Sequence, residues 1–145
     1  DIQAAIGRDQ LTHLEEFNNR RREIVARYQR ELKDVRGLIL PPEIEESNVH
    51  SWHIYTPLID IDELGFSRDD FMAKMSAKNI GTAYHYQALH LFTCFSELTG
   101  LKAGVLPNSE YVSERIVSLP LFPAMTDEDV TDVIEAIKEI CGMKG

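Results

Sequence analysis

The sequence predicts an α+β domain of two layers, in which a short and mostly antiparallel sheet carries helices on one face. The first observation is a proline-free stretch at residues 2–35, whose apolar side chains recur at spacings of three and four. The second is a set of three short segments, 50–60, 81–86 and 118–123, with the composition or alternation of strands. The third is the amphipathic run that follows Thr126.

The stretch 2–35 is expected to form one long helix that stops at Gly37, a residue suited to the left-handed position after a helix. At about 1.5 Å per residue, such a helix spans roughly 50 Å, which exceeds the width of a domain of this size. We therefore expect one half to pack on the domain and the other half to project, with the small Ala4 and Gly7 allowing close docking. The alternative is a break at residues 18–19 that folds the helix back on itself.

Extended segments are expected next. Residues 38–40 are an apolar run closed by two prolines, and residues 50–60 are aromatic and β-branched, so both are predicted to be extended. Pro57 places the second of these at a sheet edge or at an irregularity. The sequence Ser67-Arg-Asp-Asp70 has the form of a capping box, which predicts a helix directly after Ser67.

The second half of the chain is expected to alternate short strands with helices. Residues 81–86 alternate in the manner of a strand that runs into a loop, and residues 89–98 are expected to form a short helix ended by Gly100. Asn108 or Ser109 is expected to cap the following helix. Three apolar side chains of the short helix are expected to turn inward: Phe92, Phe95 and Leu98.

The C-terminal part is expected to close the fold. Residues 118–123 form a short strand interrupted by proline, and Thr126 is expected to cap a last helix that ends at Gly142. The spacing i, i+3, i+4, i+7 gives that helix one apolar face, made of Val130, Val133, Ile134 and Ile137.

Composition excludes several classes of function. The chain has 145 residues, one domain's length, and a net charge of -9, which argues against a general binder of phosphate backbones. Two cysteines do not make a disulfide framework, so a reducing cytoplasmic setting is expected. No apolar run is long enough to span a membrane. The chain begins with Asp1 rather than methionine, in a helical pattern already under way, so we expect further residues before it.

A small-molecule site, if there is one, is expected where the strand at 81–86 enters its loop, because His85, Tyr86 and His90 gather there. Packing in the core or on the surface is the plainer interpretation of these histidines. A metal site is not expected, because His50 and His53 lie three apart on a predicted strand and point to opposite faces.

Two other patterns are weaker. Cys94 could act as a thiol nucleophile, but its apolar neighbours favour a buried and inert thiol. Arg20, Arg21 and Arg22 could hold a phosphate, but consecutive helical residues point in different directions, which favours a solvated or intersubunit face. No glycine-rich nucleotide loop and no nucleophile elbow is present in the sequence.

Four motifs in the same order nevertheless resemble the C-terminal part of the DegT/DnrJ/EryC1/StrS family of pyridoxal-phosphate (PLP) dependent aminotransferases, which act on nucleotide-linked keto sugars. The resemblance covers nearly the whole chain, and the Ser-Leu-Pro-Leu-Phe-Pro run with its preceding Glu-Arg is the most specific part. The motifs are Asp1–Gly7 with Leu11, Leu14 and Asn19–Arg22; His50–Tyr55; Gly81–Tyr86 with His90; and Ser113–Pro123.

The resemblance implies a fold-type I aminotransferase, with a large cofactor domain followed by a small domain. Residues 1–36 would then be a long interdomain helix and residues 37–145 the C-terminal small domain. The Schiff-base lysine, the acid paired with the pyridine nitrogen and most phosphate ligands lie upstream in the family. No catalytic, cofactor-binding or metal-binding residue is therefore expected in this chain, which should be inactive in isolation.

The family also implies a homodimeric enzyme that transfers an amino group, with glutamate as the expected donor, for surface polysaccharide or lipopolysaccharide synthesis. In family members, the loop that corresponds to residues 85–90 approaches the sugar nucleotide. His85 is therefore expected to contact substrate, and Tyr86 and His90 are weaker candidates. Trp52 and Tyr55 are expected to pack.

Two rival hypotheses remain at this stage. The chain could be a stand-alone, non-catalytic binding or dimerisation module with the same fold, using the long helix for association. It could also be a metal-binding domain that uses its histidines.

Overall fold

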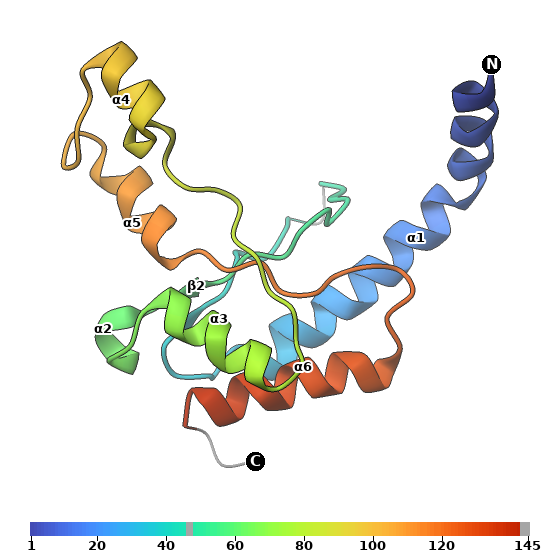
Figure 1. Cartoon of the computed structure of the whole chain (residues 1–145). Helices are drawn as coiled ribbons and strands as arrows, with labels where there is room; N and C mark the ends of the chain where they lie inside the picture. The colour runs from blue at the N-terminus through green and yellow to red at the C-terminus, as the bar shows by residue number, and fades with distance from the viewer. Residues whose placement is uncertain (46–47, 143–145) are drawn as a thin grey trace.

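A computed structural model describes residues 1–45 and 48–142 of the chain. The elements are α1 (Ile2–Leu32), β1 (Leu38–Ile39), β2 (Leu58–Ile59), α2 (Ile61–Leu64), α3 (Arg68–Ala77), the 3-10 helix η1 (Leu89–Leu91), α4 (Thr93–Thr99), α5 (Pro107–Arg115) and α6 (Asp127–Ile140). A long first helix, α1, crosses under a small irregular sheet (Figure 1). Helix α6 packs on α1 and helix α3 packs on α6, so that the molecule has a helical layer and a sheet layer.

Helix α1 runs without a break from Ile2 to Leu32, which confirms the long helix and rules against a fold-back at residues 18–19. It ends before the predicted stop at Gly37, because the chain makes two turns after Lys33 and only then reaches the glycine. Gly37 has φ +73°, and a Cβ atom there would lie 2.3 Å from the Leu64 side chain. The glycine therefore shapes the turn into β1 rather than the helix end.

The sheet is antiparallel throughout. Strand β1 pairs with β2, with Leu38 opposite Ile59. Residues Ile116–Leu119, here called the central segment, lie next to residues 55–58 through two isolated antiparallel bridges. On its other side, the central segment forms one bridge to Ala83. The mostly antiparallel sheet is thus confirmed, although most of its contacts are single bridges between extended segments.

Two predicted strands are much shorter than expected. Of residues 50–60, only Leu58 and Ile59 form a strand, and Tyr55 adds a bridge, because Trp52 adopts φ +47° and interrupts the extended backbone. Of residues 81–86, only Ala83 pairs with the sheet. The chain lies at the sheet edge there and bends at His85, so this pairing consists of a single bridge.

The core lies between the second half of α1, the sheet and α6. Tyr28 and Leu32 are fully buried, as are Phe71 and Met75 on α3. The predicted inner face of α6 is confirmed, with every member buried: Val130, Val133, Ile134 and Ile137. Apolar burial of this kind, at about 25 cal/mol per Å², is the main favourable contribution to folding. It fixes the second half of α1, whereas residues 1–16 are all exposed and the first half projects from the body (Figure 1).

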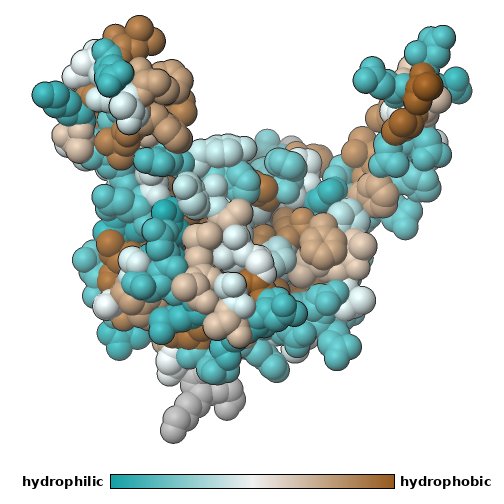
Figure 2. All heavy atoms as spheres, viewed as in Figure 1, coloured by the Kyte–Doolittle hydropathy of each residue, from teal (hydrophilic) through white to brown (hydrophobic). Residues whose placement is uncertain are grey.

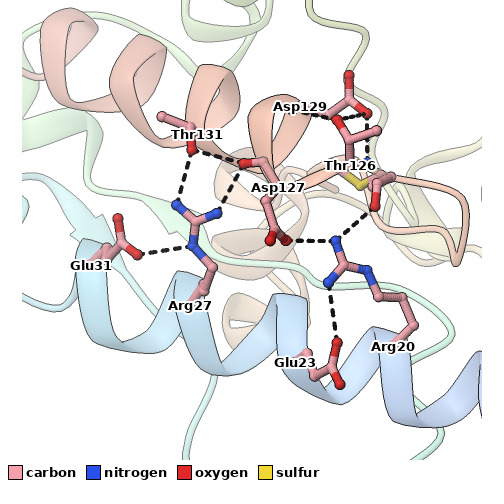
Figure 3. Close-up of polar contacts among 9 residues, drawn as sticks. Arg20, Glu23, Arg27, Glu31, Thr126, Asp127, Asp129 and Thr131 are labelled. Carbon is pink, nitrogen blue, oxygen red and sulfur yellow. Dashed lines mark hydrogen bonds and ion pairs between the residues drawn. The ribbon is translucent and has the colours of Figure 1, made fainter.

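Two arginines of α1 bind the first turn of α6 (Figure 3). Arg20 donates to Asp127 Oδ1 and to the Met125 carbonyl, both at 2.8 Å. Arg27 donates to the Asp127 carbonyl at 3.0 Å and to Thr131 Oγ1 at 3.1 Å. The Arg20 guanidinium holds the pKa of the Asp127 carboxyl below its usual range. Arg20 thus pairs within the chain, a contact that the predicted solvated or intersubunit face of this arginine run does not include.

Helix starts follow the predicted capping chemistry in two cases out of three. Ser67 and Thr126 each form a complete capping box with the acid three residues later. The third helix, α5, is capped by neither Asn108 nor Ser109, because it already begins at Pro107. A proline suits the first helical position, where its missing N–H leaves no hydrogen bond unmade.

Residues 89–106 form an arm with α4 at its far end, away from the core (Figure 1). The short helix and its Gly100 stop are confirmed, but its apolar side chains do not turn inward. Phe92 and Phe95 are about two-fifths exposed and Leu98 is 81% exposed, because α4 packs on η1 and not on the core. Cys94, predicted to be buried, is exposed for the same reason.

Apolar side chains gather at the ends of both projecting parts. Figure 2 shows them on the arm and on the free end of α1. On α1 the exposed members are Ile2, Ile6, Leu11 and Leu14. Exposed apolar groups of this extent on two separate projections are typical of docking surfaces. None of the helices in residues 1–45 and 48–142 is long and apolar enough to cross a membrane.

Two buried tyrosines give a matched test of this core. Tyr28 donates its hydroxyl hydrogen to the Pro120 carbonyl at 2.9 Å, whereas the buried Tyr55 hydroxyl has no partner among the described residues. We expect Tyr28→Phe to lower the free energy of unfolding by about 1–2 kcal/mol, because the Pro120 oxygen is left unpaired. Tyr55→Phe should leave it within about 0.5 kcal/mol of wild type or raise it, because an unsatisfied polar group is removed.

Urea denaturation of the two variants and the wild type measures both effects. Equal losses in the two variants would contradict the assignment of the hydrogen bond to Tyr28 alone.

Candidate functional site

The candidate site is built on residues 81–88, which leave the sheet edge and lead into the arm. Three contacts hold this loop against the body. Ala83 exchanges both backbone hydrogen bonds with Ser118, at 2.7 and 3.3 Å. The Arg68 guanidinium lies 4.2 Å from the centre of the Tyr84 ring, a cation–π contact. The Ala88 N–H donates to Ser113 Oγ at 2.9 Å. These contacts fix the loop against the body, and residues 81–88 are here called the platform.

His85 and Tyr86 lie together on this platform. The half-buried His85 ring approaches Ser118, with 2.7 Å between Nδ1 and Oγ. The Tyr86 ring meets the His85 ring edge to face, with 4.9 Å between centroids, and the Tyr86 side chain is 75% exposed. An imidazole with one nitrogen engaged by the protein, next to an exposed phenol, can present hydrogen-bonding groups to a polar ligand.

His90 does not join this pair. It belongs to η1, is buried, and places Nε2 at 2.9 Å from Glu110 Oε1. The Glu110 carboxylate also accepts from the backbone N–H groups of Gly104, at 2.8 and 2.9 Å, and of Leu106, at 3.2 Å. His90 and Glu110 therefore join the start and the end of the arm, and the histidine faces the interior of the arm.

Hydrogen bonds to the ionised carboxylate lower the pKa of Glu110, with the Gly104 N–H as the largest cause and the His90 ring as the second. A carboxyl whose pKa is lower in the folded state than in the unfolded chain stabilises the folded state at pH values above the unfolded-chain pKa, here about 4.5. The stabilisation is lost as the pH falls through the folded-state pKa. Protonation of Glu110 should therefore loosen the arm only in acid.

Sequence reasoning missed the residues that hold the platform. Ser118 lies inside the proline-containing run that was interpreted as a strand, and only the alternation Val117-Ser118-Leu119 could have marked it as a polar residue between two core residues. Ser113 and Glu110 lie on α5, and their partners are 25 and 20 residues away. No local pattern carries such long-range pairings.

The other candidate residues do not converge. No group of three or more histidine, cysteine or acidic side chains within the described residues could hold a metal ion. His50 instead accepts a hydrogen bond from the Trp52 N–H at 2.9 Å and lies beside its ring. Trp52 and Tyr55 pack against each other with 5.9 Å between ring centroids, in agreement with the packing role predicted for them.

The described lysines do not fit a PLP site, which needs an amine placed at the cofactor carbonyl and a cradle for its phosphate. None of them is buried. Lys78 lines a pocket of about 430 Å³ between α3 and α6, but Glu139 Oε2 lies 2.6 Å from its Nζ. Asp129, Asp132 and Glu135 line the same pocket, and their carboxylates would repel a phosphate.

Solved structures of known proteins share this fold. The aminotransferase TlmJ from Streptoalloteichus hindustanus is 33% identical, with a TM-score of 0.83 over 94% of this chain and 35% of its own. The PLP form of the putative sugar aminotransferase Spr1654 from Streptococcus pneumoniae is 26% identical, with a TM-score of 0.87 over 97% of this chain and 35% of its own. The fold, with its long first helix, is that of the small domain of a fold-type I aminotransferase.

The chain belongs to the DegT/DnrJ/EryC1/StrS aminotransferase family, whose model matches residues 1–138. The uncharacterized protein MJ1066 of Methanocaldococcus jannaschii is 44% identical over 140 residues, which are 97% of this chain and 36% of the relative. The spore coat polysaccharide biosynthesis protein SpsC of Bacillus subtilis is 37% identical over 141 residues, again 97% and 36%. The chain thus spans about a third of the length of the relatives it matches.

The Glu110 contacts generate a test by pH titration. We expect the Gly104 amide proton resonance to shift toward its random-coil position as the pH falls below about 4.5, because protonation removes the acceptor charge. In Glu110→Gln the same resonance should stay flat over that range. The measurement is a two-dimensional amide NMR titration, with Glu139→Gln as the control variant. A flat response in the wild type would contradict the role given to Glu110.

Proposed function

We propose that this chain is the C-terminal portion of a PLP-dependent aminotransferase that aminates a nucleotide-linked keto sugar, with glutamate as amino donor, for surface polysaccharide synthesis. The single observation that carries the proposal is the family match over residues 1–138, together with the likeness to solved sugar aminotransferases. The name of the Bacillus subtilis relative, a spore coat polysaccharide biosynthesis protein, supports the polysaccharide setting.

In this proposal the chain divides at the end of its first helix. Residues 1–36, which comprise α1 and the turns that follow Leu32, form the interdomain connection, and residues 37–145 form the small domain. The exposed apolar side chains on the first half of α1, Ile2, Ile6, Leu11 and Leu14, support a docking surface for a large upstream domain. Relatives nearly three times as long as the matched region leave room for such a domain.

The large domain would supply the cofactor site, since the described lysines of this chain do not fit one. When bound, PLP would provide the carbonyl and the electron sink that amino-group transfer requires. A homodimer in the cytoplasm belongs to the same proposal. Both cysteines are free in the structure, which suits a reducing compartment.

This chain's own contribution is to bind and orient the substrate. His85 and Tyr86 are proposed to contact the sugar nucleotide, because both are carried by the fixed platform and Tyr86 is exposed. His90, the third residue predicted to contact substrate, has its side chain buried against Glu110. We propose that it supports the site by holding the arm, since a direct contact would require that hydrogen bond to open.

The absence of a cofactor site from this chain can be tested chemically. We expect the purified 145-residue chain, incubated with PLP and then reduced with borohydride, to carry no adduct concentrated on one lysine. The physical reason is that no described lysine is buried or placed next to a phosphate cradle. Peptide mass spectrometry measures the adducts. A stoichiometric adduct at a single lysine would contradict the proposal.

The gene sequence distinguishes the proposed aminotransferase from the rival hypothesis, a stand-alone dimerisation module. An open reading frame that encodes a cofactor domain upstream of Asp1 would exclude the module, and its absence would exclude the aminotransferase.

The substrate contact is tested in the longer enzyme. We expect His85→Ala to raise the KM for the keto-sugar nucleotide about 10- to 100-fold, because one hydrogen bond to a charged or polar substrate group is lost. Steady-state transamination with glutamate measures the effect. Glu135→Gln, on the exposed side of α6 and without a hydrogen bond in the described chain, serves as the matched surface control. An unchanged KM in His85→Ala would remove His85 from the substrate site.

A further inference from the structure

The central segment presents its side chains to two faces of the sheet. Val117 and Leu119 are buried in the core, and their N–H groups donate to carbonyl groups of residues 55–57 at 3.0 Å. Ser118, between them, must point to the opposite face, because side chains alternate along extended backbone. Its own backbone groups pair with Ala83 instead. The residue is therefore the link between the helix-packed sheet and the platform.

Ser118 holds the platform at two points. Its backbone binds Ala83, and its side chain binds Nδ1 of His85, two residues further along. The serine is 6% exposed, so this hydrogen bond is shielded from water. Among the described residues, Nδ1 makes the one polar contact of the His85 ring, which leaves Nε2 as the nitrogen available to a ligand.

We propose that Ser118 is a positioning residue for His85, and that it keeps Nε2 protonated and directed toward an oxygen acceptor of the ligand. A hydroxyl can both donate and accept. In the neutral imidazole the serine O–H donates to Nδ1, because this buried hydroxyl has no other acceptor among the described residues, so the proton lies on Nε2. In the imidazolium the serine oxygen accepts from Nδ1–H, and Nε2 still carries its proton.

A hydroxyl permits this result, and the lack of another described acceptor for its hydrogen selects it. A backbone carbonyl or a carboxylate at Nδ1 can only accept, so it would force the neutral ring to carry its proton on Nδ1 and turn Nε2 into an acceptor. With a serine there, His85 donates in both charge states. The ligand chemistry that fits is an oxygen acceptor such as a phosphate or a sugar hydroxyl. This deepens the proposed function and rests on it for the identity of the ligand.

The matched pair Ser118→Thr and Ser118→Val tests the inference, since the two side chains have the same shape and differ by a hydroxyl. The measurement is the imidazole nitrogen NMR spectrum of the 145-residue chain across pH. We expect the wild type and Ser118→Thr to show a neutral His85 with the proton on Nε2 and Nδ1 as the acceptor. Ser118→Val should show a loss of this preference and a mixture of the two tautomers.

Three results would overturn the proposal. The first is a wild-type His85 with its proton on Nδ1, which needs no variant and therefore holds even if Ser118→Val fails to fold. The second is a valine variant whose amide spectrum is native and whose His85 tautomer equals that of the wild type. The third is a threonine variant whose His85 shows the same mixture of tautomers as the valine variant.

The spectra involve no substrate, so they separate this inference from the proposed function. In the longer enzyme, Ser118→Val is expected to raise KM for the sugar nucleotide about tenfold, with most of the loss recovered in Ser118→Thr. If the tautomer follows the hydroxyl but His85→Ala leaves KM unchanged, the positioning stands and the substrate contact fails. If His85→Ala changes KM but the His85 tautomer is the same in the wild type and in Ser118→Val, the substrate contact stands and the positioning role of Ser118 fails.

Discussion

The central segment is the part of the structure on which the rest depends. Its backbone binds residues 55–58 on one side and Ala83 on the other, while Val117 and Leu119 enter the core. The platform with His85 has no other connection to the sheet among the described bridges. The position of the candidate site relative to the sheet is therefore set by one short stretch of extended backbone, while Arg68 of α3 and Ser113 of α5 hold the same loop from the helices.

Those helices are joined by two kinds of contact. Apolar packing between α1 and α6 provides the stability, and the arginines Arg20 and Arg27 fix where along α1 the first turn of α6 lies. Carbonyl oxygens and a carboxylate accept these hydrogen bonds, so their geometry is specific in a way that apolar contact is not. This combination holds one half of a very long helix firmly and leaves the other half exposed.

Sequence reasoning found the elements that depend on local chemistry. The length of α1, the capping boxes at Ser67 and Thr126 and the buried face of α6 follow from residue type and spacing alone. It failed where tertiary position decides. The apolar residues of α4 look like core residues, yet they lie at the end of an arm, and the extended segments form shorter strands than their composition predicts. In the candidate site, the sequence marks His85 and Tyr86 as candidates but gives no sign of the Ser118 anchor of His85, because that contact spans 33 residues.

The free half of α1 acts as a lever. It is part of one continuous helix held only at its other end, and about 15 residues project by roughly 22 Å. A tilt of about 10° at the clamped end would displace the tip by about 4 Å. Small rearrangements near the first turn of α6 are thus magnified at the far end. In the proposed two-domain enzyme, the orientation of the large domain relative to the small one would therefore depend on the accuracy of these contacts.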